Sequence, residues 1–552
     1  MRFPRRRAWA WAAAVFAVVV SLAVTALLPR PDTADTLVPV AAEPGVEDDG
    51  VDCAVPDTGP LTSRSRLPDP FRKLDGTRVS TRSDWRCRRA EIRELAERHL
   101  YGQKPARPES VTGTVSRTGI TVRVTHQGRS ASFSASVDPP SGTGPFPAVV
   151  VLGGLGADTA TIKSSGAAVI SLDPYTLGKE GTPRDNKQGA FYGLYGSSSS
   201  TGLLMAWSWG VSRVIDVIEQ SDGSVLRADA TGVTGCSRFG KGAFVAGAFD
   251  QRIALTMPIE SGSAGTGILR GIPGESGAQP LSSAYSEQPW LGDAFGSFTG
   301  SPATLPVDTH EIVGLVAPRG LLVMENPHVD WLGARSGSVA ALGGAEVYKA
   351  LGAGGNVSYW SDVQDGTHCA ARPEWRTPLR QNIQKFLLGS GSSPGVFRIS
   401  PARSGDLSAW RDWQTPNLAD GGSSGGGTGG DTGGDNGGGN GGDTGGGPGT
   451  PGDTCTATYR TVNSWSGGFQ GEVTVRNDGN GALDGWTVGM TLSPGQSLSS
   501  LWNGRNTGTG GAVTVRNTDW NGSVAPGSTT TFGFTVTGSS SAAPNTLTCA
   551  RS

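Results

Sequence analysis

The segment Gly-Cys-Ser-Arg-Phe-Gly-Lys at residues 235–241 places a serine between glycines at the end of an apolar run. A serine at a strand-to-helix turn, flanked by glycine, is how a nucleophile elbow presents its hydroxyl above a sheet. The spacing here is G-x-S-x-x-G instead of the common G-x-S-x-G, so the motif alone fits a structural serine in a turn equally well. Ser237 is the first candidate for a nucleophile.

Two later residues complete a triad in the chain order of α/β-hydrolases, which is serine, acid, histidine. Glu260 follows the next apolar run, and His368 comes late in the same region. Three aspartates also occupy stretches where other α/β-hydrolases keep the acid: Asp330, Asp362 and Asp365. They stay open as alternatives to Glu260.

The other histidines are weaker candidates. His310 is a second possibility for the triad, but it precedes an expected helix, which favours a structural role. His328 lies in the loop before Trp331, where it would line a cleft. His99 on an early helix and His126 in a strand-like surface segment have no predicted role.

Apolar runs predict the elements that position these residues. Near-continuous runs that end in glycine or polar residues indicate strands of a parallel sheet covered on both faces, here at 146–154, 167–175, 230–237, 252–261, 319–325 and 356–363. Amphipathic helices are predicted at 203–220, 341–352 and 88–102, the last behind a cap at Ser83 or Asp84. The class is α/β, an α/β-hydrolase-type doubly wound sheet. A helix that starts at the elbow would put Lys241, four residues on, about one turn from Ser237.

Composition divides the chain and excludes several classes of protein. Of 552 residues 85 are glycine, and residues 420–453 form a glycine-rich tract that we interpret as a flexible linker. The net charge of −2 argues against a basic nucleic-acid binder. No HExxH, CxxC or P-loop motif occurs, so no metal or organic cofactor is implied. The expected parts are a leader at 1–41, a catalytic region at 48–419, the linker and a terminal module at 454–552.

The amino terminus predicts export. A basic start is followed by an apolar run from Ala8 to Leu28, the pattern of a secretory signal, with an uncleaved anchor as the alternative. We expect a secreted monomer without stable membrane association. Six cysteines in an exported chain indicate disulfides with fifteen possible connectivities, and the simplest pairing closes Cys455 to Cys549 within the terminal module.

The catalytic region resembles the glucuronoyl esterases, carbohydrate esterase family 15. The resemblance rests on GCSRFGKGA, on Glu260 twenty-three residues beyond Ser237, and on His368 followed directly by Cys369. It continues through SEQPW (286–290), APRGLLVMEN (317–326) and VDWLG (329–333), and covers roughly residues 53–395.

The resemblance implies catalytic roles. Ser237 would attack the ester carbonyl, His368 would relay the proton, Glu260 would orient the imidazole, and Arg238 would stabilise the oxyanion through its backbone N–H and guanidinium. It also implies Cys236–Cys369 and Cys53–Cys87 disulfides. A third disulfide of fungal relatives has no cysteines here, which puts the rigidity of the Trp331 loop in question.

The same resemblance implies a sugar pocket. Lys241, Gln279, Glu287 and Trp331 would hold the glucuronate ring. Sugar hydroxyls require paired donors and acceptors, and an indole offers an apolar face with one N–H. Without the resemblance, a solvated lysine in the first turn of a helix would be the favoured interpretation of Lys241, and a core aromatic that of Trp331.

The terminal module alternates β-branched and polar residues between Asn/Gly turns and contains no lysine, which predicts an all-β sandwich. Its tryptophan spacing resembles a family 2 cellulose-binding module. The resemblance implies that Trp465, Trp502 and Trp520 form a flat strip that stacks on glucose rings, and that Trp486 is core.

These observations favour a secreted serine esterase that hydrolyses 4-O-methyl-glucuronate esters linking glucuronoxylan to lignin and that binds the cellulose surface. The alternative is an acetyl or feruloyl xylan esterase on the same scaffold. A cellulose-binding scaffold without catalysis is disfavoured by the complete triad.

Overall fold

The computed structural model describes residues 47–418, 455–465, 467–502, 504–518, 521–538 and 542–551. The predicted leader at 1–41 and the predicted linker at 420–453 lie outside these residues. Within the described ranges, no helix combines the length and the apolar character needed to cross a bilayer.

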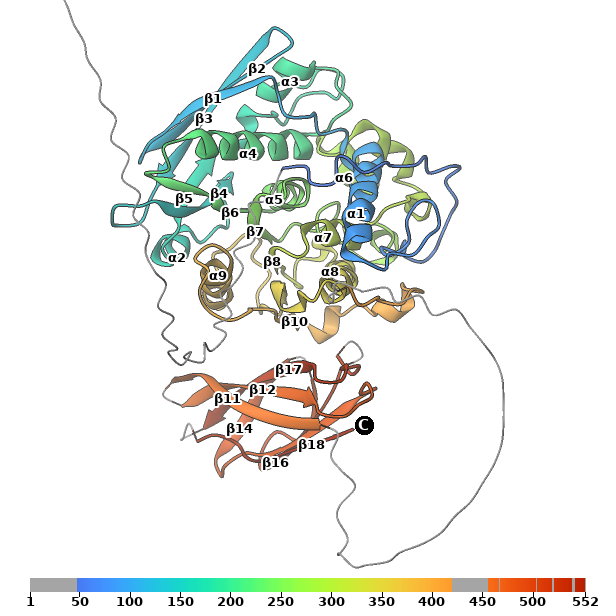
Figure 1. Ribbon diagram of the computed structural model, residues 1–552, viewed down its shortest axis with the longest axis vertical. Coiled ribbons are helices and arrows are strands. Elements are labelled where there is room, and N and C mark those ends of the chain that lie inside the picture. The colour runs from blue at the N-terminus through green and yellow to red at the C-terminus, as the bar shows by residue number, and fades with distance from the viewer. Residues whose placement is uncertain are drawn as a thin grey trace, which may run out of the picture. The chain divides into compact units, whose positions relative to one another are not determined.

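The catalytic region is built on one ten-stranded mixed sheet in the order β1-β2-β3-β5-β4-β6-β7-β8-β9-β10 (Figure 1). From β5 to β10 all neighbours are parallel, whereas β1, β2, β3 and β5 pair antiparallel. The strands are β1 Ser110–Val115, β2 Gly119–His126, β3 Arg129–Asp138, β4 Phe146–Leu152, β5 Ala168–Leu172, β6 Leu226–Cys236, β7 Ile253–Ile259, β8 Gly320–Met324, β9 Val357–Ser361 and β10 Phe397–Ile399. The six predicted parallel strands are confirmed, and the antiparallel extension was not predicted.

Helices cover both faces of this sheet, because alternate side chains of its strands point to opposite sides. On β4, Val150 belongs to the core under α4, α5 and α8, while Val149 and Val151 belong to a second core under α2 and α9. This explains why the central strands are continuous apolar runs. The helices are α1 Arg82–Ala96, α2 Thr159–Ser164, α3 Ala190–Tyr195, α4 Leu203–Gln220, α5 Arg238–Phe249, α6 Leu281–Ser286, α7 Thr309–Val316, α8 Ala334–Ala350 and α9 Pro373–Phe386.

Two predicted helix starts were wrong. The early helix begins at Arg82 instead of 88, because Thr81 is its N-cap and Asp84 closes a capping box with it, so neither Ser83 nor Asp84 is the cap. The helix predicted at 341–352 is α8, which starts at Ala334 directly after Gly333 in the left-handed region. Its first turns contain small and polar residues, which hide the helical periodicity. The helix predicted at 203–220 is α4.

The non-catalytic histidines have structural surroundings. His310 lies inside α7 and not before it; it is fully buried, its Nε2 lies 2.9 Å from the carbonyl oxygen of Pro68, and its ring stacks on Trp413. Burial lowers the pKa of His310 to about 4. His99 and His126 pack against aromatic rings of neighbouring elements.

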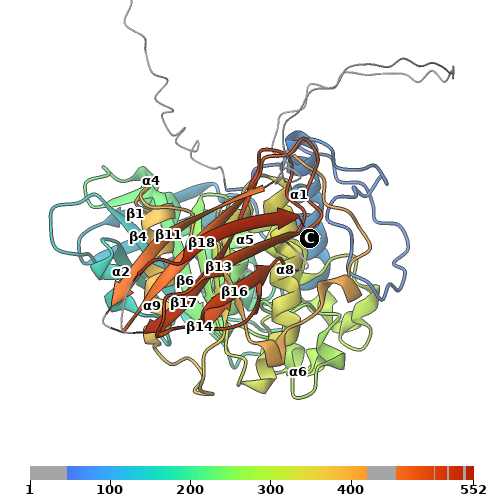
Figure 2. The ribbon, with the colours of Figure 1, turned by 90° about the horizontal axis from the view of Figure 1, so that it is seen from below.

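The terminal module is a sandwich of two four-stranded antiparallel sheets, β11-β12-β17-β14 and β15-β16-β13-β18, parts of which can be followed in Figure 2. The inner faces share one core, and the Cys455–Cys549 disulfide joins β11 to β18. The strands are β11 Cys455–Trp465, β12 Gly468–Asn477, β13 Trp486–Thr491, β14 Gln496–Trp502, β15 Arg505–Thr507, β16 Ala512–Arg516, β17 Thr529–Gly538 and β18 Asn545–Arg551.

Of the module's four tryptophans, only Trp486 has a described side chain. It is fully buried, stacks on Phe532 and donates its indole N–H to the carbonyl oxygen of Asn521, as predicted for a core residue. The side chains of Trp465 and Trp502, and Trp520 as a whole, lie outside the described residues.

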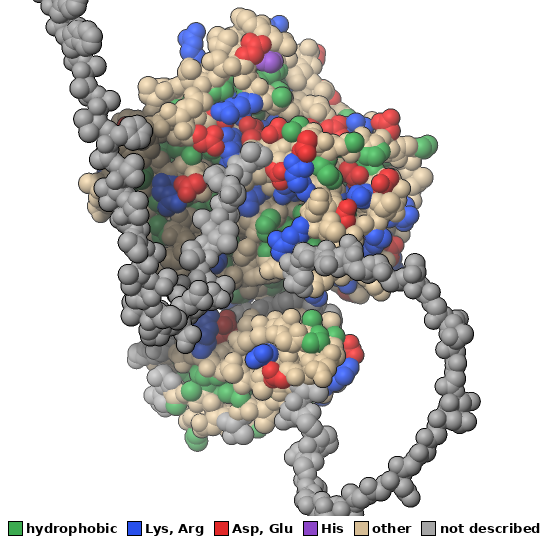
Figure 3. Space-filling model, viewed as in Figure 1, with side chains coloured by type: hydrophobic (Ala, Val, Ile, Leu, Met, Phe, Trp, Pro, Cys, Tyr) green, Lys and Arg blue, Asp and Glu red, His purple; other side chains and the backbone are tan. Residues whose placement is uncertain are grey.

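Charged side chains of both signs are interspersed on the face of the molecule in Figure 3. This is the surface expected from 46 basic and 48 acidic residues that nearly balance.

Candidate active site

Ser237 sits at the turn between β6 and α5, as a nucleophile elbow requires. Its backbone has φ 58° and ψ −125°, a strained conformation, and its side chain is half-buried. Gly235 and Gly240 permit this turn, because a Cβ at either position would lie only 2.6 Å from a carbonyl oxygen, of Phe239 and Ile259 respectively. The helix N-terminus that follows exposes the backbone N–H of Arg238, which has no partner within the helix.

Glu260 and His368 form the remaining pair of the triad. Glu260 follows β7, is fully buried, and its Oε2 accepts a hydrogen bond from His368 Nδ1 at 2.7 Å. The same oxygen accepts the backbone N–H of Cys369 at 2.7 Å. Because this oxygen already accepts one N–H, the contact with His368 is best satisfied with the imidazole proton on Nδ1, which leaves Nε2, 3.7 Å from Cys369 Sγ, as the nitrogen without a proton.

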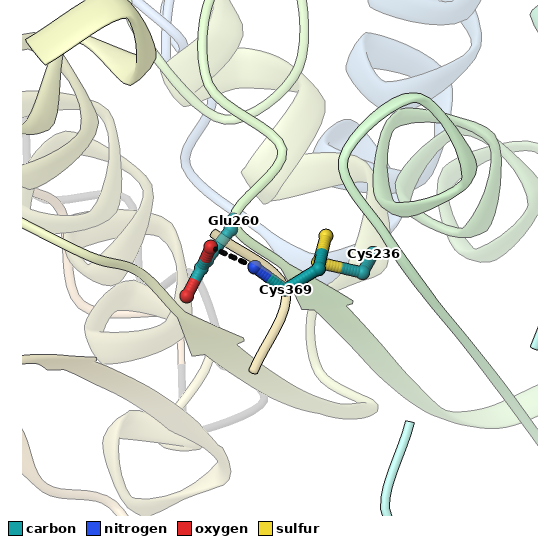
Figure 4. Close-up of side chains that lie close together, drawn as sticks. All are labelled: Cys236, Glu260 and Cys369. Atoms are coloured by element: carbon teal, nitrogen blue, oxygen red, sulfur yellow. Dashed lines mark hydrogen bonds between the residues drawn. A yellow bond between two sulfur atoms is a disulfide. The ribbon is translucent and has the colours of Figure 1, made fainter. Parts of the chain in front are cut away.

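A disulfide joins Cys236 to Cys369, whose backbone N–H bonds Glu260 (Figure 4). Cys236 directly precedes Ser237 and Cys369 directly follows His368, so the cross-link brings the backbones of the two candidate residues together across 133 residues of sequence. The two sulfurs lie within 4.8 Å of a Glu260 oxygen, a spacing that would suit a metal, but they are bonded to each other and offer no thiolate.

Backbone strain gathers at the same place. Among the described residues, five other than glycine have positive φ, and three of these are Ser237, Glu260 and Cys369. Such conformations persist where the surrounding structure over-determines them, and they cluster at active sites.

The three alternative acids are engaged elsewhere. Asp365 pairs with Arg372 at 2.6 Å, and this ion pair lowers the pKa of its exposed carboxyl. Asp362 pairs with Arg398 at 2.5 Å, and Asp330 pairs with Arg403. Of the four candidates, Glu260 is the one that bonds His368.

Arg238 presents its guanidinium next to the elbow. Its Nη1 donates to Glu180 at 3.0 Å, and the group lies 5.7 Å from the centre of the Trp290 ring. Partial burial disfavours the charged form, but the charge and hydrogen bond of Glu180 outweigh it and raise the pKa of Arg238. The cation is therefore permanent and held in place.

Lys241 is buried and is not a solvated helix lysine. Its backbone N–H donates to the carbonyl of Ser237, as the predicted helix requires, and its ammonium donates to the carbonyls of Ser261 and Ser263, the latter at 2.6 Å. Burial lowers the pKa of Lys241 to about 8, although the carboxylates of Glu325 and Glu287 favour the charged form. An ammonium has three donors, so two bonds to carbonyls leave a third for a ligand.

The other three predicted pocket residues form one connected group. Gln279 donates its amide to Glu287 Oε2 at 2.8 Å, and its backbone N–H to the carbonyl of Trp331 at 3.0 Å. Trp331 is 51% exposed, so it is not a core aromatic, and the edge-on contact of its ring with His368 spans 5.7 Å between centroids. These contacts put the group directly beside the triad. His328, before this loop, is exposed.

The loop of Trp331 is held without a third disulfide. It forms a short 3₁₀ turn, Asp330–Leu332, closed by the bond from Gln279 and by the ion pair of Asp330 with Arg403. Hydrogen bonds thus supply contacts where fungal relatives were expected to use a cross-link.

Comparisons with known proteins agree with this geometry. The family model "Glucuronyl esterase, fungi" matches residues 122–352, and "Cellulose binding domain" matches residues 455–551. A 4-O-methyl-glucuronoyl methylesterase of Neurospora crassa is 38% identical over 373 residues, which cover 66% of this chain and 93% of that protein. The chain belongs to the glucuronoyl esterase family.

Solved structures of this family have the same fold. The catalytic domain of the glucuronoyl esterase from Hypocrea jecorina is 36% identical with a TM-score of 0.62, and the match covers 66% of this chain and 100% of that one. A serine-to-alanine mutant of the enzyme from Sporotrichum thermophile, in complex with methyl 4-O-methyl-β-D-glucopyranuronate, is 37% identical with a TM-score of 0.62, covering 66% and 99%. The predicted carboxylic ester hydrolase with a cellulose-binding domain is confirmed, and the acetyl or feruloyl alternative is not favoured.

Several residues of this glucuronoyl esterase's site were not predicted as site residues. They are Glu180 and Trp290, which hold Arg238, and Glu325, Asn326 and Arg372, which surround Glu260 and Lys241. Burial raises the pKa of Glu325 to about 7, although the hydrogen bond from Thr266 acts in the opposite direction and lowers it. A signal was available for Glu325 and Asn326, because they directly follow an apolar strand at the edge of the sheet where α/β enzymes bind ligands.

Proposed function

We propose that the catalytic region hydrolyses esters of 4-O-methyl-D-glucuronic acid, the bonds that link glucuronoxylan to lignin alcohols in the plant cell wall. The observation that carries this proposal is the placement of the Gln279–Glu287–Trp331 group against His368. A small acyl group such as acetyl would have no use for these polar and aromatic side chains. The bound uronate ester in the related Sporotrichum thermophile enzyme supports the same substrate class.

The geometry supports a two-step acyl transfer. Ser237 Oγ attacks the ester carbonyl while His368 Nε2 takes its proton, and the imidazolium that forms is stabilised by the Glu260 carboxylate at Nδ1. The oxyanion accepts hydrogen bonds from the Arg238 backbone N–H and guanidinium. His368 then returns the proton to the departing alcohol, which leaves an acyl-serine that water hydrolyses by the same steps in reverse order.

The sugar would be recognised by charge and by stacking. Lys241 donates its remaining N–H to a hydroxyl, Gln279 and Glu287 offer a donor and an acceptor held in register by their own hydrogen bond, and Trp331 presents its exposed ring. Because Glu287 favours the charged form of Lys241 and Gln279 bonds Glu287, the pocket is arranged before the substrate arrives.

We infer that the terminal module binds cellulose through Trp465, Trp502 and Trp520. The matched cellulose-binding family and the burial of Trp486, the tryptophan predicted to be core, support this role. We also propose that residues 1–41 direct export, that 420–453 tether a catalytic region at 48–419 to a module at 454–552, and that the secreted protein is a monomer.

An assay of the purified protein on methyl 4-O-methyl-glucuronate, beside an acetyl ester, tests the substrate class. We expect turnover of the uronate ester to dominate, and Ser237→Ala to reduce it by about 10⁶-fold without loss of fold. Preference for the acetyl ester would refute this proposal and would indicate an acetyl esterase. Full activity of Ser237→Ala would remove the triad assignment.

A further inference from the structure

A buried carboxylate outside the triad contacts the residue next to the nucleophile. Glu180 lies in the loop after β5, and its side chain is 9% exposed. It accepts a hydrogen bond from Arg238 Nη1 at 3.0 Å, one from the hydroxyl of Tyr175 at 2.8 Å, and one from the indole N–H of Trp290 at 2.5 Å. Three donors from three segments therefore converge on one carboxylate.

The distribution of these bonds restrains the carboxylate fully. Tyr175 and Arg238 share Oε2, while Trp290 bonds Oε1, so neither oxygen can rotate away without breaking a contact. The Trp290 ring also lies 5.7 Å from the Arg238 guanidinium and 5.8 Å from the Lys241 ammonium. The Glu180 carboxylate is thus held by three hydrogen bonds, and its partner Trp290 lies close to both cations of the site, Arg238 and Lys241.

We propose that Glu180 is the positioning residue for Arg238. It holds the guanidinium in one plane beside Ser237, so that its remaining N–H donors are aimed at the oxyanion before the ester is attacked. The guanidinium is a planar fork with five donors, so the bond at Nη1, together with the Trp290 ring beside the group, limits its rotation and still leaves donors for the substrate. This inference rests on the proposed function, in which Arg238 is an oxyanion donor.

Two effects of the carboxylate oppose each other, and the structure indicates which is larger. As a counterion, Glu180 reduces the positive field of Arg238, which by itself would slow the reaction. However, the Arg238 side chain is 39% exposed, so solvent already screens its charge, and removal of the counterion would increase the field little. A donor that is not fixed in advance loses most of its effect on the transition state. Orientation should therefore dominate.

The test is Glu180→Gln, assayed on methyl 4-O-methyl-glucuronate. The glutamine amide keeps the size of the side chain, but its NH₂ must face at least one of the three donors. At least one of the three hydrogen bonds is therefore lost, and the side chain is held less firmly. We expect kcat to fall by roughly 10–100-fold while KM changes less than about threefold, because the oxyanion exists only in the transition state. An unchanged or faster kcat would overturn the proposal.

Glu346 offers a matched control away from the triad. Its side chain on α8 is 7% exposed and pairs with Arg411 at 3.1 Å, and Arg411 is 32% exposed, nearly the same burial as the Glu180–Arg238 pair. Glu346→Gln should lower the melting temperature as much as Glu180→Gln and leave kcat unchanged. An equal fall of kcat in both variants would assign the effect to general destabilisation.

A double-mutant cycle separates positioning from any independent role. In the Arg238→Ala background, Glu180→Gln should cause no further loss of kcat, since there is no guanidinium left to orient. A further 10–100-fold loss would show that Glu180 acts by another route and would refute the inference. Full activity of Arg238→Ala alone would refute the oxyanion role on which it rests.

A second variant keeps the test decisive if Glu180→Gln does not fold. Tyr175→Phe removes one of the bonds that hold the carboxylate and leaves the ion pair itself. We expect a smaller loss of kcat, about 3–10-fold, that also disappears in the Arg238→Ala background. A loss that persists there would contradict the proposal.

Discussion

Replacement of Glu260 by glutamine tests the assignment of the catalytic acid. In the structure, Oε2 of Glu260 accepts two N–H groups at 2.7 Å, from His368 and from the backbone of Cys369. The other oxygen faces two donors at longer range, Nδ2 of Asn326 at 3.5 Å and Nε of Arg372 at 3.6 Å. All four neighbours are donors, so one half of any amide must face a donor.

The distances predict how the glutamine amide will turn. With its NH₂ at the position of Oε2, it would meet two donors at 2.7 Å; with its NH₂ at the position of Oε1, it meets donors at about 3.5 Å, as the distances to Asn326 and Arg372 show. The second orientation is favoured, and in it the bonds to His368 and Cys369 survive. His368 therefore keeps its tautomer, and the variant loses the negative charge but not the geometry.

The size of the effect follows from that charge. In the wild type, the Glu260 carboxylate attracts the imidazolium that forms when His368 takes the proton of Ser237. For charge centres about 4 Å apart and an effective dielectric constant near 20, this attraction is about 4 kcal/mol, and Glu260→Gln loses it. At roughly 1.4 kcal/mol for each factor of ten, kcat should fall by about 10²–10³-fold. A variant that also lost the tautomer would fall further, toward about 10⁴-fold.

The assay is steady-state hydrolysis of methyl 4-O-methyl-glucuronate, with the melting temperature measured on the same samples. Asp362→Asn is the control, because Asp362 is an alternative acid that pairs with Arg398 at 2.5 Å, and neither residue is among the four neighbours of the Glu260 carboxylate. It should change kcat by less than about threefold. A loss below tenfold for Glu260→Gln, or a larger loss for Asp362→Asn, would refute the assignment of Glu260.

Three further predictions concern the cross-link, the buried lysine and the terminal module. The double variant Cys236→Ala/Cys369→Ala removes a disulfide that spans 133 residues of sequence. Its free energy of unfolding should fall by about 2–5 kcal/mol, and its kcat should fall as well; an unchanged melting temperature would contradict this. Because the pKa of Lys241 is lowered to about 8, the ammonium loses its proton as the pH rises through 8, and KM for the uronate ester should rise there. Lys241→Met should have a higher KM that no longer responds to pH in that range, and a persisting response would exclude Lys241 as its source. Trp502→Ala should weaken retention on crystalline cellulose by roughly 1–3 kcal/mol, with aromatic stacking on bases as the nearest guide, and should leave turnover of the soluble ester unchanged; full retention would place Trp502 off the binding face.

The central strands and the nucleophile elbow were predictable because their signals are local. A strand buried on both faces has to be apolar at every position, and the six runs from 146–154 to 356–363 all became strands of the sheet. The elbow is equally local, since its conformation depends on glycines within a few residues of Ser237. The antiparallel strands β1 to β3 were not predicted. One of their faces is polar, so their apolar residues alternate with polar ones and form no continuous apolar run.

The order of nucleophile, acid and histidine, the cysteines available for pairing and the division into a catalytic region and a sandwich module can all be read from the residue order. Which of four acidic residues meets His368 depends on tertiary packing, because Glu260, Asp330, Asp362 and Asp365 all follow strands or loops of the same edge and differ in their partners. Tertiary packing also decided the setting of Lys241 and the bond of Glu180 to Arg238, 58 residues away in sequence. Such contacts depend on how separate segments pack, and the spacing of residues within one segment does not predict that packing.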